Sequence, residues 1–194
     1  VQVPLIQEIF QIMGIQVLEN QDYEADDVIA SICEKYKNEE KIIFSSDKDL
    51  CQLINENTII YDGMKQKILK EADVKDKFGI YPNQIKDYLA LIGDSSDNIS
   101  GVTGIGPVAA KNLLIEFGSL ESILQNVDRI NKKTTQDKIK NGTNEAILSE
   151  KLTRLYIFPV ESINNFQIKK TDLLKEMLTE LKLESIKHLL YGVK

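Results

Sequence analysis

Residues 41–49 read KIIFSSDKD, and this stretch decides the fold class. Its apolar start is typical of a buried parallel strand, and a second run of this kind follows at residues 58–61. A shorter strand is expected at residues 15–19, and residues 24–36 between the strands carry apolar side chains at helical spacing. Strands that alternate with helices predict an α/β fold, with a parallel sheet and flanking helices.

The pattern changes to helices from residue 71 onward, and no strand-like alternation occurs beyond residue 100. We therefore expect an α/β core over residues 1–97 and a helical region over residues 98–194. Apolar stripes at three- and four-residue spacing predict helices at residues 4–13, 24–36, 71–78, 85–92, 108–117, around 123–124, 147–155 and 173–190.

The composition describes a soluble globular chain of 194 residues, 42% hydrophobic and 28% charged. No run approaches the roughly 18 apolar residues of a membrane helix, and the N-terminus lacks a secretory pattern, so we expect a cytoplasmic protein without a membrane partner. Cys33 and Cys51 stand singly in apolar stretches and are expected to be buried thiols. The single histidine, His188, is expected to have a surface or packing role.

The net charge of −6 is unevenly distributed along the chain. Residues 1–97 carry 10 Lys against 19 Asp and Glu, whereas residues 98–194 carry 14 Lys and Arg against 11 acids. Residues 129–154 hold seven basic side chains and three acidic ones. This basic run could face phosphates, although a solvated helix face explains most runs of this kind.

Three acidic segments account for more than the whole net charge. Each has a structural explanation taken singly, because acids favour the first turn of a helix and aspartate is common in turns. Taken together they predict a site, since the segment after residue 46 ends a strand and sites in open α/β sheets gather at carboxyl ends of strands. Spacings of two and three residues put neighbouring acids on one side, in an extended segment and in a helical turn respectively. The seven side chains are Glu24, Asp26, Asp27, Asp47, Asp49, Asp94 and Asp97.

So many carboxylates in one crevice need a cation, and hard oxygen ligands select Mg²⁺ or Mn²⁺. Two such ions about 3.5–4 Å apart form the arrangement that cleaves phosphodiesters without histidine. The acidic segments therefore predict a two-metal hydrolytic site, in which Asp26, Asp47, Asp49, Asp94 and Asp97 are the candidate catalytic residues.

A glycine-rich hairpin follows the third acidic segment and reads GVTGIGP over residues 101–107. Pro107 at the first position of a helix leaves backbone amides and the positive end of the helix dipole directed outward, which suits a phosphate. Backbone amides read no base sequence, so a nucleic acid would be held by its sugar-phosphate chain. A plain tight loop is an equally good reading of this motif alone. The candidate DNA-binding residues are Gly101, Gly104, Ile105, Gly106 and Lys111.

The motifs YEADDV at residues 23–28, SDKDL at 46–50 and GDSSDNI at 93–99, followed by the hairpin, resemble the 5′-nuclease domain of bacterial DNA polymerase I. The likeness covers the whole chain in order. It departs from the family at Ser46, where glycine is usual, and at Ser100 and Thr103, where proline is usual.

The resemblance implies a PIN-like 5′-nuclease core followed by a helix-hairpin-helix that grips duplex DNA and can hold K⁺ through main-chain carbonyls. It also implies that the family domain begins upstream, with a metal-binding strand and a basic arch, so the core here is N-terminally incomplete and exposes apolar surface. By this likeness Glu24, Asp26 and Asp27 surround the first metal, and Asp47, Asp49, Asp94 and Asp97 the second.

The function expected from this resemblance is a two-metal 5′-3′ exonuclease and flap endonuclease acting on 5′ flaps and nicked or branched DNA in replication and repair. The parent chain could continue into a polymerase domain. Two alternatives stay open at this point. One is a duplex-binding fragment that keeps the hairpin but lacks a complete first metal site, and the other is a metal-binding structural domain with no nucleic-acid role.

Overall fold

The computed structural model describes residues 2–163 and 167–192. The chain forms two compact units, one of residues 26–158 and the other of residues 1–25 together with 159–194. The predicted boundary after residue 97 stays a prediction.

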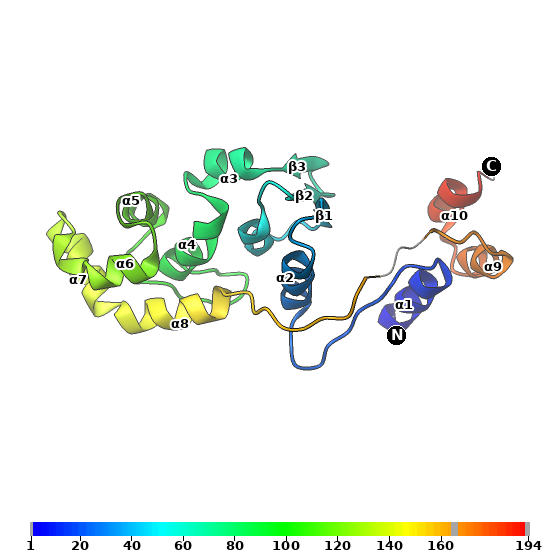
Figure 1. The fold of residues 1–194 in the computed structure, drawn as a ribbon, viewed down its shortest axis with the longest axis horizontal. Helices are drawn as coiled ribbons and strands as arrows, with labels where there is room; N and C mark the ends of the chain where they lie inside the picture. The colour runs from blue at the N-terminus through cyan, green and yellow to red at the C-terminus, as the bar shows by residue number, and fades with distance from the viewer. Residues whose placement is uncertain (1, 164–166, 193–194) are drawn as a thin grey trace. The chain divides into compact units, whose positions relative to one another are not determined.

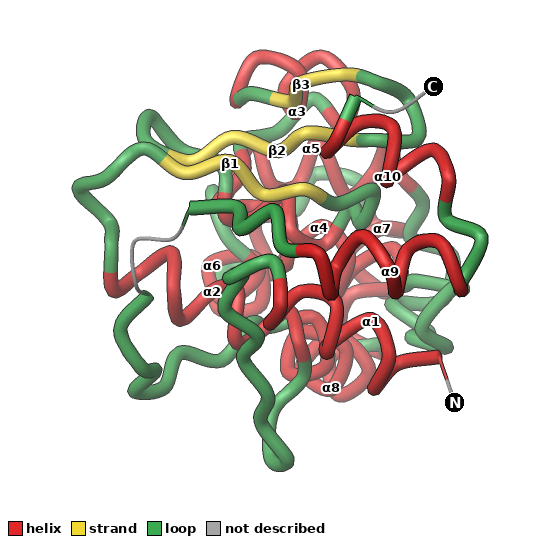
Figure 2. The backbone as a smooth tube through the Cα atoms, turned by 90° about the vertical axis from the view of Figure 1, so that its right-hand side faces the viewer, coloured by secondary structure: helices red, strands yellow, loops and turns green. Residues whose placement is uncertain are grey.

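A small mixed sheet of three strands belongs to the 26–158 unit (yellow in Figure 2). Strand β1 (Lys41–Phe44) runs parallel to β2 (Thr58–Asp62), with Ile43 opposite Ile60. Strand β3 (Lys67–Leu69) returns antiparallel to β2 through a tight turn. The predicted parallel pair is thus confirmed, while the antiparallel third strand was not predicted from the sequence.

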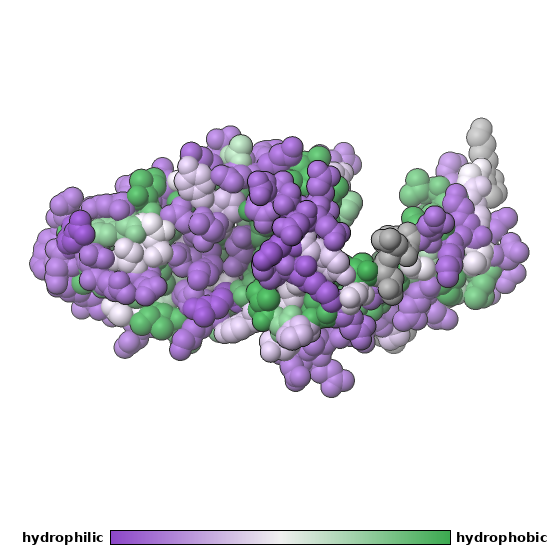
Figure 3. Space-filling view, in the orientation of Figure 1, coloured by the Kyte–Doolittle hydropathy of each residue, from purple (hydrophilic) through white to green (hydrophobic). Residues whose placement is uncertain are grey.

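Strand β1 is an edge strand, because its only neighbour in the described sheet is β2. Its side chains alternate, so Ile43 is buried whereas Ile42 and Phe44 are 57% and 77% exposed. Exposed apolar surface was expected beside this sheet, and these two side chains provide it. Elsewhere the visible face of this unit is mostly hydrophilic, with hydrophobic residues in separate patches (Figure 3).

The strand expected at residues 15–19 is absent, and this prediction is wrong. The segment leaves helix α1 (Gln2–Ile12) through Gly14, which has φ +80°, and continues as a loop. The described residues of its unit form helices and loops, so the segment has no strand to pair with. A short apolar run becomes a strand only where a partner supplies the ladder of hydrogen bonds.

Helices pack on the buried face of the sheet and build the rest of the 26–158 unit around α4 (Ile85–Ile92), which packs against α8 (Thr143–Thr153) and α5 (Pro107–Phe117) (Figure 1). Leu89, Ala90 and Leu91 are buried, as expected of a helix that has neighbours on several sides. The other helical segments of this unit are α2 (Ala25–Lys35), η1 (Asp49–Leu53), α3 (Glu71–Phe78), η2 (Pro82–Gln84), α6 (Leu120–Gln125), η3 (Val127–Arg129) and α7 (Lys133–Asn141).

Helix α7 was missed by the sequence analysis because it is almost wholly polar. Its sequence KTTQDKIKN offers a single apolar residue, Ile139, which is fully buried. Gln136, one turn earlier, is also buried and donates to the Val127 carbonyl at 3.1 Å. Tertiary packing of these two side chains stabilises a helix whose periodicity is too weak to detect.

The other unit consists of α1, α9 (Asp172–Glu180) and α10 (Glu184–Tyr191) around a small core of Ile9, Leu174 and Leu178. The apolar stripe at residues 173–190 is therefore two helices, separated by a turn in which Lys182 has φ +56°. His188 lies exposed on α10, as expected.

Both cysteines are free thiols, Cys51 buried and Cys33 partly buried. Burial raises the pKa of each thiol. No helix in the described residues is long and apolar enough to cross a membrane.

Candidate active site

The acidic site begins in the turn that follows β1. The Ser45 hydroxyl accepts the backbone N–H of Asp47 at 3.0 Å, and the Asp47 carboxylate accepts the N–H of Asp49 at 2.9 Å. These acceptors turn the chain into η1, so Lys48 has the helical angles φ −74° and ψ −26°. The extended conformation assumed for this segment is therefore wrong, because local side-chain acceptors replace the ladder of a strand.

The third acidic segment is a closed loop after α4. Asp94 and Ile99 exchange two backbone hydrogen bonds of 2.8 Å. Ser96 donates its N–H to the Asp94 carboxylate at 3.0 Å, and Asn98 has a left-handed φ of +58°. The helical turn expected here is thus a loop, yet it still brings Asp94 and Asp97 together.

Three carboxylates from these two segments converge. One oxygen each from Asp49, Asp94 and Asp97 lies within 4.8 Å of the others. In the described part of the chain, Asp49 Oδ1 is buried and accepts no hydrogen bond, whereas the buried Asp94 Oδ2 lies 2.6 Å from the Lys48 ammonium. A buried carboxylate oxygen without a donor, in a group of excess negative charge, fits a hard divalent cation.

The electrostatics of the group show that its negative charge is only partly compensated. The pKa of Asp49 is raised to about 7, first by burial and then by the neighbouring carboxylates. Burial acts to raise the pKa of Asp94 as well, but hydrogen bonds from Lys48 and Ser96 outweigh it and lower that pKa. A bound cation would favour the ionised form of both side chains.

The first acidic segment stands apart from this group. Asp26 and Asp27 lie in the first turn of α2, and the buried Asp27 carboxylate accepts the backbone N–H of Tyr156 at 2.8 Å. Neither belongs to the converging group, and Asp47 also lies beside it rather than in it. Glu24 is exposed just before α2. The metal-ligand role of these four residues stays a prediction.

The hairpin is anchored by its apolar residues and by the predicted DNA-binding residue Gly101, which is buried, and it presents its other two glycines. Val102 and Ile105 are buried, and the Val102 N–H donates to the Leu91 carbonyl at 2.9 Å. Gly104 and Gly106 are exposed at the start of α5. Of the predicted DNA-binding residues, Ile105 therefore has a buried side chain and can offer its backbone.

A lysine outside the predicted set reaches the hairpin. Lys138 of α7 donates to the Gly104 carbonyl at 2.9 Å, and its side chain lies close over that glycine. The predicted residue Lys111 instead lays its stem against Gly79, at the end of α3. The basic run at residues 129–154 predicted a positive surface, but the pairing of Lys138 with Gly104 is a contact across 34 residues that no local pattern reveals.

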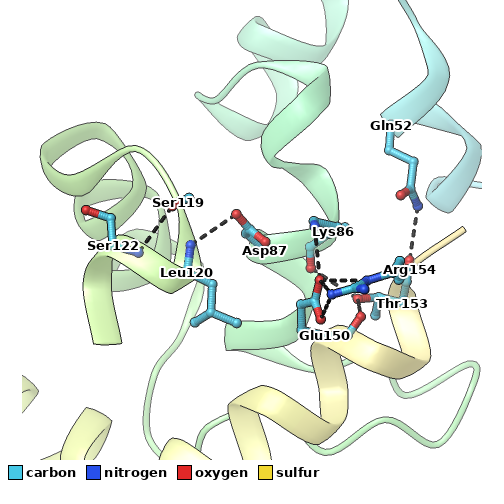
Figure 4. A network of polar contacts seen from close by, with 9 residues as sticks. All are labelled: Gln52, Lys86, Asp87, Ser119, Leu120, Ser122, Glu150, Thr153 and Arg154. Carbon is cyan, nitrogen blue, oxygen red and sulfur yellow. Dashed lines mark hydrogen bonds and ion pairs between the residues drawn. The ribbon is translucent and has the colours of Figure 1, made fainter. Parts of the chain in front are cut away.

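A second polar cluster, distinct from the acidic group, joins α4, α6 and α8 (Figure 4). Glu150 pairs with Lys86 at 2.9 Å and with Arg154 at 2.8 Å. The buried Asp87 accepts the N–H of Leu120 at 3.0 Å, at the first residue of α6. Each carboxylate has a charged or backbone partner, so this cluster holds helices together.

Two sequence models of one family match the chain. The N-terminal resolvase-like domain of 5'-3' exonucleases matches residues 1–79, and their C-terminal SAM fold matches residues 80–179. The chain therefore belongs to the 5'-3' exonuclease family, which confirms the resemblance drawn from its motifs.

Individual relatives support this family membership. A 5'-3' exonuclease of Aquifex aeolicus (strain VF5) is 41% identical over 192 residues, which are 96% of this chain and 65% of the relative. The DNA polymerase I of Caldicellulosiruptor bescii is 39% identical over 163 residues, which are 80% of this chain and 19% of that protein. The chain thus spans less than two thirds of these curated relatives.

The fold is shared with solved nucleases. The bacteriophage T5 D15 flap endonuclease, in a pseudo-enzyme-product complex with DNA and metal ions, superposes with a TM-score of 0.69 at 20% identity. The match covers 78% of this chain and 55% of the T5 chain. This likeness confirms the predicted nuclease fold.

Proposed function

We propose that this chain is a metal-dependent 5′-3′ nuclease region that hydrolyses DNA phosphodiesters at 5′ flaps and in nicked or branched duplexes, in replication and repair. The observation that carries the proposal is the convergence of Asp49, Asp94 and Asp97 from two segments, with the buried Asp49 Oδ1 accepting no hydrogen bond. Family membership adds to it, since the Aquifex relative is named a 5'-3' exonuclease.

In this proposal Asp49, Asp94 and Asp97 hold a divalent ion, Mg²⁺ or Mn²⁺, and Asp47 keeps the turn that presents Asp49. The α2 carboxylates Asp26 and Asp27, with Glu24, form the first of two metal sites. Bound ions of this kind activate a water molecule and stabilise the leaving oxygen of a phosphodiester. The chain's own contribution is to fix these oxygens before the metal arrives.

The hairpin holds the DNA backbone in the same proposal. The exposed Gly104 and Gly106 allow close approach, and the start of α5 presents amides and a positive dipole. Lys138 adds a positive charge beside them. Hairpin carbonyls could also take K⁺, as proposed from the family resemblance. A polymerase domain in the parent chain belongs to this proposal, supported by the likeness to a DNA polymerase I. A cytoplasmic location, expected from the sequence, belongs to it as well.

Cleavage of a 5′-labelled flap DNA by this chain, in Mg²⁺ or Mn²⁺, tests the proposal. Asp94→Asn should abolish cleavage, since it removes one charge from the converging group. Asp87→Asn is the matched control, because Asp87 is a similarly buried carboxylate, 6% exposed against 3% for Asp94, that caps α6 instead. Chelator-resistant cleavage, or equal activity of both variants and the unmodified chain, would contradict the metal site.

A duplex-binding module without chemistry is the second candidate, and one observation favours it. The carboxylates that converge in the described residues are three, and the α2 acids are not among them. This candidate predicts salt-dependent DNA binding that survives chelation and is never followed by cleavage.

A further inference from the structure

Lys48 places an ammonium group inside the acidic group. Its Nζ donates to Asp94 Oδ1 at 2.7 Å, lies 2.6 Å from Asp94 Oδ2 and donates to the Ser96 hydroxyl at 3.2 Å. The Asp94 side chain is 1% exposed, whereas that of Lys48 is 36% exposed. The carboxylate is thus enclosed and the lysine reaches it from the surface.

This placement follows from the turn after β1. Lys48 stands between two aspartates, and in an extended strand its side chain would point away from theirs. The helical backbone angles at Lys48, set by the Ser45 and Asp47 acceptors, let it reach Asp94, 46 residues along the chain. The lysine is therefore held at the acidic group by the fold and not by sequence spacing.

The ammonium occupies both oxygens of Asp94. A divalent ion bound by Asp94 would need one of the same oxygens as a ligand, at about 2.0–2.6 Å. The ion and the Lys48 ammonium cannot share one lone pair of that oxygen, so they compete for it. Lys48 is the partner that compensates the enclosed carboxylate when metal is absent. Its flexible four-carbon stem can withdraw to solvent.

We infer that Lys48 is the resident counter-cation of the metal-free site and sets the divalent-metal affinity by competing for Asp94. The inference deepens the proposed function, since it rests on a metal site at Asp49, Asp94 and Asp97. Lys48 acts on the metal equilibrium and is a positioning residue rather than a catalytic one. The Lys48 ion pair stabilises the metal-free fold. It also makes the metal bind more weakly than it would to the same carboxylates without the lysine.

Mn²⁺ titration calorimetry and thermal unfolding of Lys48→Met, in chelator and in Mn²⁺, test the inference without DNA. The Mn²⁺ dissociation constant should fall by about tenfold, the size of an ordinary coupling between two sites. In chelator the melting temperature should fall by about 5 °C, because Asp94 loses its counter-charge. Added Mn²⁺ should restore more stability to the variant than to the unmodified chain.

The matched control is Lys67→Met, which removes an ion pair of the same length, 2.6 Å to Asp73, away from the acidic group. It should leave Mn²⁺ affinity unchanged. Lys48→Arg keeps the positive charge, so its Mn²⁺ dissociation constant should not fall as it does in Lys48→Met. If Lys48→Met does not fold in chelator, Lys48→Gln replaces it, with the same expected changes in Mn²⁺ affinity and melting temperature.

Unchanged or weaker Mn²⁺ binding by the Lys48→Met or Lys48→Gln variants overturns the inference. Tightening by Lys48→Arg equal to that of Lys48→Met also overturns it, because the charge would then be irrelevant. Asp94→Asn separates the two proposals. If it does not reduce Mn²⁺ binding, the metal site itself is refuted, whereas the predicted Lys48 effects without any DNA cleavage refute the nuclease activity alone.

Discussion

The Asp27 carboxylate accepts the backbone N–H of Tyr156 at 2.8 Å, across 129 residues of sequence. One turn later on α2, Ser31 accepts the N–H of Phe158 at 3.0 Å. Together these contacts fasten the segment after α8 to α2. At least one oxygen of Asp27 therefore has a structural role, whatever else the side chain does.

Asp27→Ala should lower the free energy of unfolding by about 1 kcal/mol in chelator, because the Tyr156 N–H loses its acceptor. Asp27→Asn keeps an oxygen in that place and should cost much less. Chemical denaturation measures both. If Asp27→Asn keeps stability but loses nuclease activity, Asp27 serves the metal site as well, whereas equal destabilisation by both variants would contradict the structural role.

Substitutions at two glycines of the hairpin should affect folding and DNA binding separately. A Cβ on Gly101, at φ +63°, would lie 2.2 Å from the Gly93 nitrogen, so Gly101→Ala should cost about 3 kcal/mol or more. A Cβ on Gly106 meets nothing within 4 Å, so Gly106→Ala should keep the fold. Its duplex-DNA affinity should nevertheless fall, because in the proposed function the DNA closely approaches the protein backbone at this glycine. Fluorescence anisotropy with labelled duplex measures this, and unchanged affinity would remove Gly106 from the interface.

Lys138 should contribute to DNA binding as a phosphate contact. Lys138→Ala should weaken duplex binding for all sequences and reduce the slope of log affinity against log salt by about 1. Lys151, a lysine of the same basic run on α8, offers the matched control. A slope that is unaltered in Lys138→Ala, or altered equally in Lys151→Ala, argues against a specific role for the hairpin lysine.

Asp87 makes the stability of this fold depend on pH. Burial raises its pKa, more than the Leu120 N–H and the charge of Lys86 lower it. A carboxyl with a raised folded pKa stabilises fully below its unfolded pKa of 3.8, and this contribution is lost as pH rises through the folded pKa. Asp87→Asn keeps the acceptor for Leu120 without the charge.

Thermal unfolding of both proteins in chelator, between pH 4 and pH 8, tests this assignment. The melting temperature of Asp87→Asn relative to the unmodified chain should increase with pH. A relative melting temperature that stays constant over this range would show that Asp87 is charged in the fold at little cost.

The small helical unit should unfold separately from the larger one. Leu178 is fully buried beside Ile9 and Leu174, so Leu178→Ala should cost this unit about 2–5 kcal/mol. Hydrogen exchange should accelerate in α9 and α10 and stay unchanged in α4. Leu189→Ala, on the same unit but 81% exposed, is the control. Equal acceleration in α4 would mean that the two units unfold together.

Much of this protein is determined by its sequence alone. The apolar runs at residues 41–46 and 58–61 identify the parallel pair, because a continuous apolar run is the local signature of a buried parallel strand. Apolar stripes located most helices, and the three acidic motifs identified the family. Asp49, Asp94 and Asp97, which converge in the fold, are three of the seven acidic residues that the sequence predicts to share one site.

Only the tertiary structure decides which of the local possibilities is realised. Residues 15–19 have strand character but no partner, whereas the polar segment 133–141 is a helix because Ile139 finds a pocket in the core. Lys48 enters the acidic group because a turn redirects it toward Asp94, and Lys138 rather than Lys111 covers the hairpin. These are contacts between segments distant in sequence, so their energies appear only when the chain is folded, while helix and strand periodicity is read from neighbours.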